Sequence, residues 1–357
     1  MLEVVSDLMY NRICKRVFQR ILPASPFFWD HEPVFIMKKR IILIVSLLGL
    51  ALFANIVRKI GLETIWDTIK KISPVSFIIL MFVRGIYWTI RAINWNIILR
   101  KSLIKLSLWK VFKSRVAGFA INYLTPSANI GGEAVRVMLV NHKSERNALP
   151  SVILDKTIEL IATIFFVMTA VAIAIYKIPM PRVQKYIYAG FVLFSIVSMI
   201  FILKKQRQGL LKWIITKLEK LKISFKLVRN NMDKIKEIDE NISIFHKEHK
   251  RSFTTVLILY FIQMLVWTAE IFLTLKFLGM GTITFLNSFL IVSLGSIAFV
   301  MPVLPGGIGV YELTYIAIFK LLGLSTAVCM GLVITRRVVA LTWAGLGLIF
   351  LAKGKNK

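Results

Sequence analysis

Acidic residues and cysteines are scarce in this chain of 357 residues. It has 18 Asp and Glu against 47 Lys and Arg, so its formal net charge is +29. Its two cysteines, Cys14 and Cys329, are too few for a disulfide framework or a cysteine-rich metal site. Only 18% of the residues are charged, whereas a soluble domain holds about a quarter. These shortages argue against a water-soluble enzyme.

The common enzyme motifs are absent as well. The sequence has no Gly-x-Ser-x-Gly elbow, no nucleotide-binding Gly-rich loop ending in Lys-Ser/Thr, and no dinucleotide fingerprint. His246 and His249 are three residues apart, but they lie in a basic segment without an evident third ligand. We therefore predict no metal site, no catalytic residue and no cofactor, and expect no ATP bound to this chain to drive its activity.

Apolar residues are abundant instead. They form 57% of the chain, and the mean hydropathy is +0.72, which excludes a disordered chain and predicts a polytopic membrane protein. A strongly basic chain can bind nucleic acid, but basic cytoplasmic loops and anionic lipid headgroups explain this charge more simply. We expect a multi-pass protein of the cell membrane and no nucleic-acid partner.

The apolar runs predict an all-α fold with about six membrane spans. The runs long enough to cross are 41–57, 74–99, 151–176, 186–203, 252–278 and 326–352. Four further apolar segments are short, or are interrupted by charge, proline or glycine: 108–124, 130–140, 283–301 and 310–322.

Lysine and arginine counts predict the orientation of these spans. Segment 204–251 has 14 Lys and Arg against 6 Asp and Glu, so we place it in the cytoplasm with both termini and 100–115. The loops 177–185 and 279–282 carry few basic residues and should lie outside, while the loop 58–73 fits this assignment least well.

The short segments must then enter and return on one side. They predict two opposed re-entrant helical hairpins, 108–140 and 283–322, in an inverted repeat that is typical of transporters.

Three regions flank or interrupt the predicted transmembrane domain, 38–352. Residues 1–37 form a basic N-terminal extension, and Met37-Lys38-Lys39-Arg40 resembles a true start, so Met37 is a candidate first residue. Segment 204–251 has apolar residues at helical spacing and predicts two amphipathic helices. A solvated basic linker explains its charge most simply, and a lipid-headgroup sensor is the alternative. Residues 353–357 form a basic cytoplasmic tail.

Several arginines lie inside the predicted spans, where charge is costly. Arg84 and Arg91 are seven residues apart and share one helix face with Trp88. Arg336 and Arg337 lie about a third of the way along the last span. Such residues should face a polar chamber rather than lipid. An arginine cluster of this kind suits a phosphate-bearing headgroup, although buried structural ion pairs are the alternative for any single pair.

Carboxylates accompany these arginines. Glu133 can touch Arg136 three residues later on a helix. Asp155 and Glu159 share a face, and Lys156 lies off it. The remaining predicted counter-charges or proton carriers are Glu270, well inside its span, and Glu312.

The two hairpin tips each contain proline, a Gly-Gly pair and a following glutamate. Gly131-Gly132 and Gly306-Gly307 precede helix starts, where unpaired N–H groups suit anions. The same glycines could instead permit a turn and close helix packing, and the sequence leaves both interpretations open.

The sequence resembles a flippase-like family named for the lysylphosphatidylglycerol synthase transmembrane region, over about residues 38–352. The matching motifs are Asn122-Tyr123-Leu124-Thr125-Pro126, Gly131-Gly132-Glu133-Ala134-Val135-Arg136, Ile153-Leu154-Asp155-Lys156 with Glu159, Pro305-Gly306-Gly307-Ile308-Gly309 with Glu312, and Arg336. The family's soluble synthase half uses aminoacyl-tRNA. This chain ends five residues after its last span, so we expect the translocation half alone. Lys156 departs from the family, in which arginine is more usual.

The resemblance implies an integral membrane protein that moves an anionic phosphate-bearing lipid, such as a phospholipid or an isoprenoid-phosphate lipid. The alternatives are an intramembrane lipid transferase with Asp155 or Glu159 as base, and a non-transporting regulator of lipid or glycan synthesis. A membrane-protein partner or a homo-oligomer stays open. The predicted substrate-binding residues are Arg84, Arg91, Asn122, Gly131, Gly132, Arg136, Gly306, Gly307 and Arg336.

Overall fold

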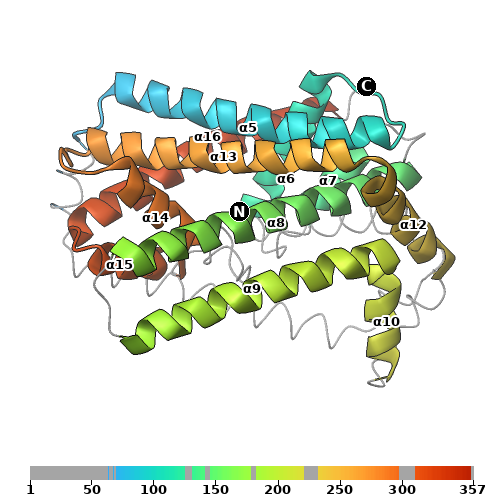
Figure 1. Cartoon of the computed structure of the whole chain (residues 1–357). Coiled ribbons are helices and arrows are strands. Elements are labelled where there is room, and N and C mark those ends of the chain that lie inside the picture. Colours follow the sequence, from blue (N-terminus) through green and yellow to red (C-terminus); the bar gives the residue numbers. More distant parts are fainter. Residues whose placement is uncertain are drawn as a thin grey trace, which may run out of the picture. The chain divides into compact units, whose positions relative to one another are not determined.

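The structure is a computed structural model that describes Glu63, Asp67 and residues 70–124, 131–140, 145–177, 182–220, 232–296 and 310–354. Within these residues it contains helices and no strand (Figure 1), which confirms the predicted all-α polytopic class. The predicted span 41–57, Met37 and the glycines Gly306 and Gly307 lie outside the described residues. The helices are α5 (Pro74–Lys101), α6 (Leu108–Leu124), α7 (Gly131–Leu139), α8 (Glu145–Lys177), α9 (Arg182–Gln208), α10 (Leu210–Lys220), α12 (Met232–Glu248), α13 (Lys250–Phe277), α14 (Phe285–Gly295), α15 (Val310–Leu321) and α16 (Thr326–Gly354).

Four helices in the described part of the chain are long and apolar enough to cross a membrane: α5, α8, α13 and α16. They coincide with the predicted spans 74–99, 151–176, 252–278 and 326–352. Helix α9 contains the predicted span 186–203 and exposes large apolar side chains along its length. That α9 crosses the membrane, and that the spans number six, stay predictions.

Two helices differ most from their predicted limits. Helix α8 begins at Glu145 rather than at residue 151, with Pro150 inside it. Pro150 removes one backbone hydrogen bond in the second turn of α8, and the long apolar part of the helix follows it. Helix α14 ends at Gly295, before the predicted limit at residue 301, and residues 297–309 lie outside the described residues.

The chain forms two compact units, and α5, α6, α7 and α13 each begin in one unit and end in the other. The described part of the first unit comprises Ala92–Val111 and most of Val137–Phe261. Here α8 and α9 lie side by side, and α12 packs against both (Figure 1). The core of this unit gathers apolar side chains from four helices, among them Ile98, Leu154, Ile242 and Tyr260.

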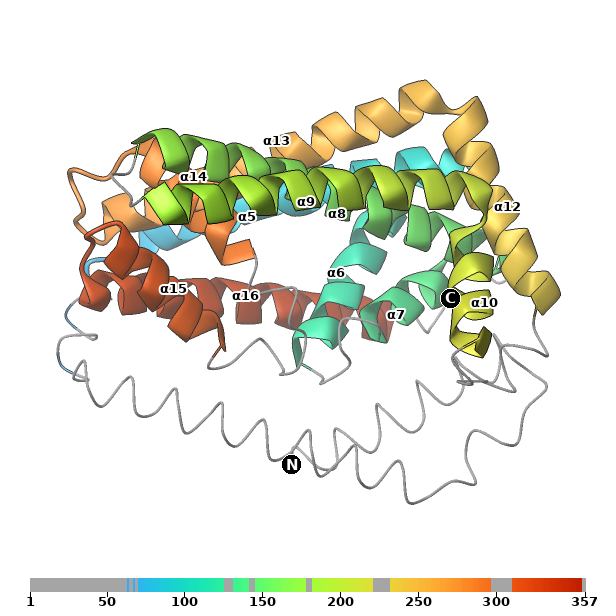
Figure 2. The same ribbon diagram turned by 60° about the horizontal axis from the view of Figure 1, so that its bottom comes forward.

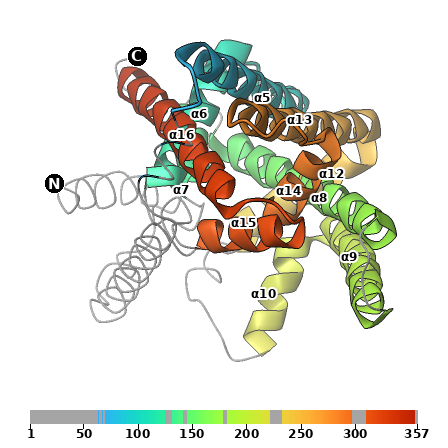
Figure 3. The same cartoon turned by 90° about the vertical axis from the view of Figure 1, so that its left-hand side faces the viewer.

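The second unit comprises the described residues before Ala92, with Phe112–Arg136 and Ile262–Lys357 as far as they are described. Helix α16 contacts helices of both predicted hairpin regions in this unit. Helix α15 lies beside the first part of α16 and packs against α14 (Figure 3), whereas α6 lies beside the later part of α16 (Figure 2). Gly347 of α16 permits the second contact, because a Cβ there would lie 2.4 Å from the carbonyl oxygen of Val116. Helices from the two predicted hairpin regions therefore pack against different parts of α16.

Candidate functional site

A buried ion pair joins α5 to α13 in the second unit. Arg84 donates a hydrogen bond from Nη2 to Oε1 of Glu270 over 2.6 Å. The Glu270 side chain is 1% exposed and the Arg84 side chain 11% exposed. The sequence predicted both residues as members of a buried charged set, and the structure pairs them directly.

Aromatic rings surround the arginines of α5. The guanidinium carbon of Arg84 lies 5.0 Å from the centre of the Tyr87 ring, and that of Arg91 lies 5.5 Å from it. Arg91 also lies over Trp88 and donates a hydrogen bond to the Tyr87 hydroxyl over 2.9 Å. The predicted face with Arg84, Trp88 and Arg91 is therefore confirmed. Tyr87 was missed, although its spacing of three and four residues from the two arginines places it on that face.

Arg336 of α16 is buried, and its hydrogen-bond partners among the described residues are neutral. Its guanidinium donates hydrogen bonds to the hydroxyls of Tyr311 and Tyr315, the second over 2.7 Å, and lies 5.0 Å from the ring centre of Trp267. No carboxylate in the described part of the chain lies within ion-pair distance of Arg336. Its Nε is buried and has no acceptor among those residues. Arg336 therefore has no direct carboxylate partner among the described residues, and Glu270 interacts with it electrostatically from beyond ion-pair distance.

The next residue, Arg337, has a carboxylate partner. It forms an ion pair with Glu312 of α15, whose side chain is fully buried. Arg337 also interacts with the side chain of Tyr123, near the end of α6. This one side chain thus links helices from both predicted hairpins to the last span.

These contacts join into one arginine–aromatic cluster, which we define as Arg84, Arg91, Arg336, Tyr87, Trp88, Trp267, Tyr311 and Tyr315. Tyr87 and Trp267 connect its two sides through an edge contact with ring centres 6.4 Å apart. Buried donors without an acceptor among the described residues include Arg84 Nε, Trp88 Nε1 and Arg336 Nε. Buried donors without partners cost free energy, so this cluster is suited to an anion that would accept from them.

Helix α6 contacts both α5 and α7. Arg115 of α6 donates a hydrogen bond to the backbone carbonyl of Arg91 over 3.1 Å. On α7, Arg136 pairs with Glu133 as their three-residue spacing predicted. The Arg136 side chain is 2% exposed and the Glu133 side chain 17% exposed, so this ion pair is largely buried.

Asn122 and the first glycine pair have a structural role that the sequence left open. The Asn122 side chain accepts a hydrogen bond from the N–H of Gly132 over 2.6 Å, close to the start of α7 at Gly131. A Cβ on Gly132 would lie 2.1 Å from the carbonyl oxygen of Gly118. Close helix packing therefore requires Gly132, and its N–H already has an acceptor within the protein. The proposed anion contact at Gly131 stays a prediction.

The carboxylates of α8 belong to the first unit. Asp155 is fully buried and accepts a hydrogen bond from the hydroxyl of Tyr260. Glu159 lies 3.3 Å from the ammonium of Lys156, whose own position is off the face that Asp155 and Glu159 share. Residues three apart are neighbours on a helix, and the long lysine side chain reaches across.

These features define a polytopic α-helical membrane protein with buried arginines between its helices. The chain belongs to the family described as the lysylphosphatidylglycerol synthase TM region, which it matches over residues 40–348. It is similar to a UPF0104 membrane protein of Pyrococcus horikoshii, with 29% identity over 85% of this chain and 93% of that relative. A UPF0104 membrane protein of Methanothermobacter thermautotrophicus is 26% identical over 83% of this chain and 90% of the relative. No solved structure matches the chain.

Proposed function

We propose that this protein translocates an anionic phosphate-bearing lipid across the cell membrane, and that the arginine–aromatic cluster binds the lipid headgroup. The observation that carries this proposal is Arg336, a buried cation whose hydrogen-bond partners are tyrosine hydroxyls. Charged residues inside membrane proteins are expensive and usually mark a substrate or ion pathway.

Comparison of the arginines supports Arg336 as the principal anion contact. Glu270 neutralises Arg84 and Glu312 neutralises Arg337, so an added anion gains less attraction from either. Tyrosine hydroxyls accept hydrogen bonds from Arg336 without neutralising it. A guanidinium offers several donors in a fixed fork that fits phosphate oxygens. Arg91 supplies a second guanidinium at the same ring cluster.

The positions of the two helix pairs support a path for the headgroup. Helix α15 lies along one part of α16, with α14 packed against α15, and α6 lies along another part of α16. In the proposed mechanism these pairs are the opposed re-entrant hairpins, and the headgroup passes between them while the acyl chains stay in lipid. Gly306 and Gly307 would line the outer tip, Gly131 the inner tip, and Glu133, Asp155 and Glu159 would act as counter-charges or proton carriers.

Purified full-length protein in liposomes tests the proposal. Fluorescent lipids with phosphatidylglycerol, isoprenoid-phosphate and neutral headgroups are placed in the inner leaflet, and their arrival in the outer leaflet is followed by chemical quenching. We expect transfer of phosphate-bearing anionic lipids and not of neutral ones. Mass spectrometry of the recovered lipid is the control for chemistry: unchanged mass with transfer supports translocation. A changed mass, or no transfer of any anionic lipid, contradicts the proposal.

A further inference from the structure

The end of α9 in the first unit carries exposed apolar side chains that stop where lysines begin. Leu193, Phe194, Val197 and Phe201 are 64%, 69%, 58% and 45% exposed. Lys204 follows within one helical turn and is exposed, and Lys205 is half-buried. The pattern therefore changes from apolar to basic over about 5 Å, at a rise of about 1.5 Å per residue.

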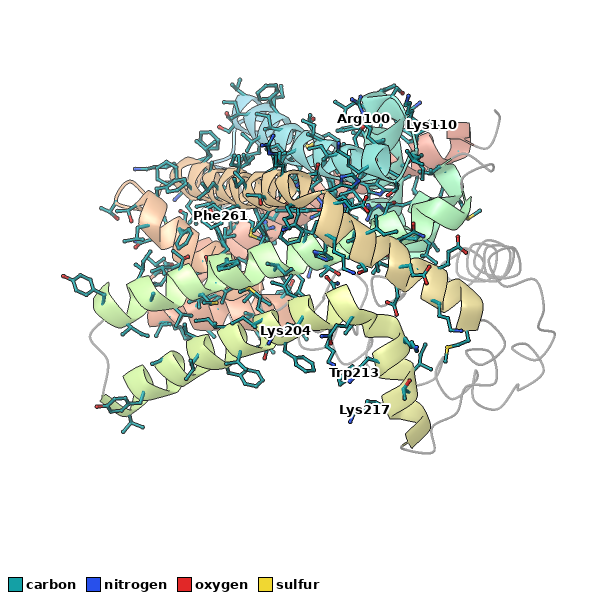
Figure 4. All side chains as sticks on the ribbon, turned by 45° about the vertical axis from the view of Figure 1, so that its right-hand side comes forward. Arg100, Lys110, Lys204, Trp213, Lys217 and Phe261 are labelled. Atoms are coloured by element: carbon teal, nitrogen blue, oxygen red, sulfur yellow. The ribbon has the colours of Figure 1, made fainter. Side chains whose placement is uncertain are left out.

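Trp213 of α10 marks the same boundary. Its ring meets the ring of Phe201 edge-on, with ring centres 5.4 Å apart. The ammonium of Lys205 lies over the Trp213 ring, 5.4 Å from its centre. Lys212 and Lys217 of α10 are exposed beside it, and Figure 4 shows Lys204, Trp213 and Lys217 along the bend from α9 into α10. Tryptophan is enriched where hydrocarbon meets headgroups, because its ring is apolar and its N–H is polar.

Contacts at the start of α10 fix its orientation relative to α9. Gly209 separates α9 from α10 with a φ of +97°, a conformation that favours glycine. Asp239 of α12 is 5% exposed and accepts a hydrogen bond from the backbone N–H of Lys212 over 2.8 Å. This carboxylate satisfies a donor in the first turn of α10, where negative charge is favourable. Figure 1 shows α10 turned away from the line of α9.

We propose that an interfacial surface on α9 and α10 binds the anionic phospholipid headgroups of the membrane that holds this chain. This surface consists of Lys204, Lys205, Lys212, Lys217 and Trp213. The exposed apolar side chains of α9 belong in hydrocarbon, so the next turn lies at headgroup depth. Lysine side chains extend along apolar surface and place their ammonium groups at the phosphates. The nearby Asp239 carboxylate bonds the α10 backbone, and the four lysines give the surface a positive charge that complements anionic lipid. This surface does not depend on the proposed translocation.

Site-directed quenching tests the surface in the full chain. A bimane fluorophore is attached to Thr216→Cys in a background with Cys14→Ser and Cys329→Ala, and the protein is placed in phosphatidylcholine vesicles. Doxyl-labelled phosphatidylglycerol is compared with doxyl-labelled phosphatidylcholine as the quencher, at equal mole fraction. We expect about fivefold or greater local enrichment of phosphatidylglycerol, because one lysine near a charged surface contributes roughly that factor. The preference should disappear in salt of about 0.5 M.

Matched variants distinguish a lipid preference caused by this surface from one caused by the net charge of the protein. One variant has Gln in place of all four lysines of the surface, Lys204, Lys205, Lys212 and Lys217, and it should lose the preference for phosphatidylglycerol. A second variant has Arg at the same four positions, and it should keep this preference. The control removes four other exposed lysines of the same unit: Lys101, Lys105, Lys247 and Lys250. Equal quenching by the two lipids in the unsubstituted background would overturn the proposal and indicate that another protein covers this surface. An equal loss in both Gln variants would show a diffuse charge effect and would also overturn it.

Gly209→Ala tests the role of the α9–α10 bend independently of charge, because this variant keeps every lysine. Alanine at a φ of +97° is strained, and its Cβ would lie 3.2 Å from Oδ2 of Asp239. We expect α10 to leave its orientation and the phosphatidylglycerol preference to fall severalfold, while circular dichroism shows the protein still helical. An unchanged preference in this helical variant would contradict the role assigned to the α9–α10 bend.

Discussion

The guanidinium of Arg336 donates a hydrogen bond to the hydroxyl of Tyr315 over 2.7 Å, which joins α16 to α15 through a neutral acceptor. The adjacent Arg337 bonds the same helix α15 through the carboxylate of Glu312. Two consecutive arginines thus join the same two helices, but only Arg337 has a carboxylate as its direct partner. This difference gives α16 both a direct ion pair and a buried cation that is bonded to neutral hydroxyls.

The Arg84–Glu270 pair should contribute strongly to stability. Replacing Glu270 by Met leaves the largely buried guanidinium of Arg84 without its carboxylate, and we expect a loss of about 3–5 kcal/mol in unfolding free energy. Arg84→Met/Glu270→Met should lose less than the sum of the two single variants, because neither charge is then stranded. Denaturant unfolding in mixed micelles measures both quantities.

The control for that experiment is the Lys156–Glu159 pair, whose side chains are 41% and 19% exposed. Lys156→Met should change the unfolding free energy by no more than about 1 kcal/mol, because a partly exposed ion pair is screened by solvent. Equal losses for Lys156→Met and Glu270→Met would contradict the buried pairing of Arg84.

Arg91→Leu should separate binding from folding. Arg91 is 8% exposed, bonds the Tyr87 hydroxyl and lies over Trp88. Leucine removes a charge that is costly to bury, so we expect the variant to insert and fold while lipid translocation is lost. Thermal unfolding and translocation are measured on one preparation. Full activity in a stable variant would remove Arg91 from the site, and an unstable protein would indicate a structural role.

Gly132→Ala should destabilise the contact between α6 and α7. The new Cβ would lie 2.1 Å from the carbonyl oxygen of Gly118, so backbone must move. We expect a loss of at least about 2 kcal/mol, at the upper end of overpacking costs. Gly345→Ala is the matched control in α16, because its added Cβ would meet no atom within 4 Å beyond its chain neighbours and the nearby backbone of its own helix. That variant should be neutral or stabilised by up to about 1 kcal/mol. Similar melting temperatures for the two variants would refute the close packing at Gly132.

Cysteine labelling tests the proposed orientation. Single cysteines replace Lys105, after α5, and Thr282, after α13, in a background with Cys14→Ser and Cys329→Ala. Both positions are exposed. An impermeant thiol reagent added to intact cells should label Thr282→Cys, and label Lys105→Cys only after the membrane is opened. Labelling of both from outside would contradict the assignment of the basic segments to the cytoplasm.

Local contacts could be predicted from the sequence because helical spacing fixes them. The shared face of Arg84, Trp88 and Arg91 and the Glu133–Arg136 pair depend only on residues within two helical turns. The long apolar runs likewise predicted α5, α8, α13 and α16, since membrane thickness sets the length of a span.

Contacts between distant helices could not be predicted in the same way. Arg84 and Glu270 are 186 residues apart, and nothing in either local pattern selects the partner. The tyrosine partners of Arg336 depend on how α15 packs against α16, which periodicity does not determine. Asn122 was predicted to bind a headgroup, but its bond to the Gly132 N–H forms only when α6 and α7 meet.

The most direct test is the translocation rate of phosphatidylglycerol in proteoliposomes containing Arg336→Gln, normalised to folded protein. Glutamine keeps a hydrogen-bond donor near Tyr311 and Tyr315 but removes the charge. We expect the rate to fall at least about tenfold, equivalent to about 1.4 kcal/mol, since hydrogen bonds to charged groups contribute roughly 1.5–3 kcal/mol. Tyr315→Phe, which keeps the charge of Arg336, should retain most of the rate. An Arg336→Gln protein that is folded and moves phosphatidylglycerol at the unsubstituted rate would contradict the account.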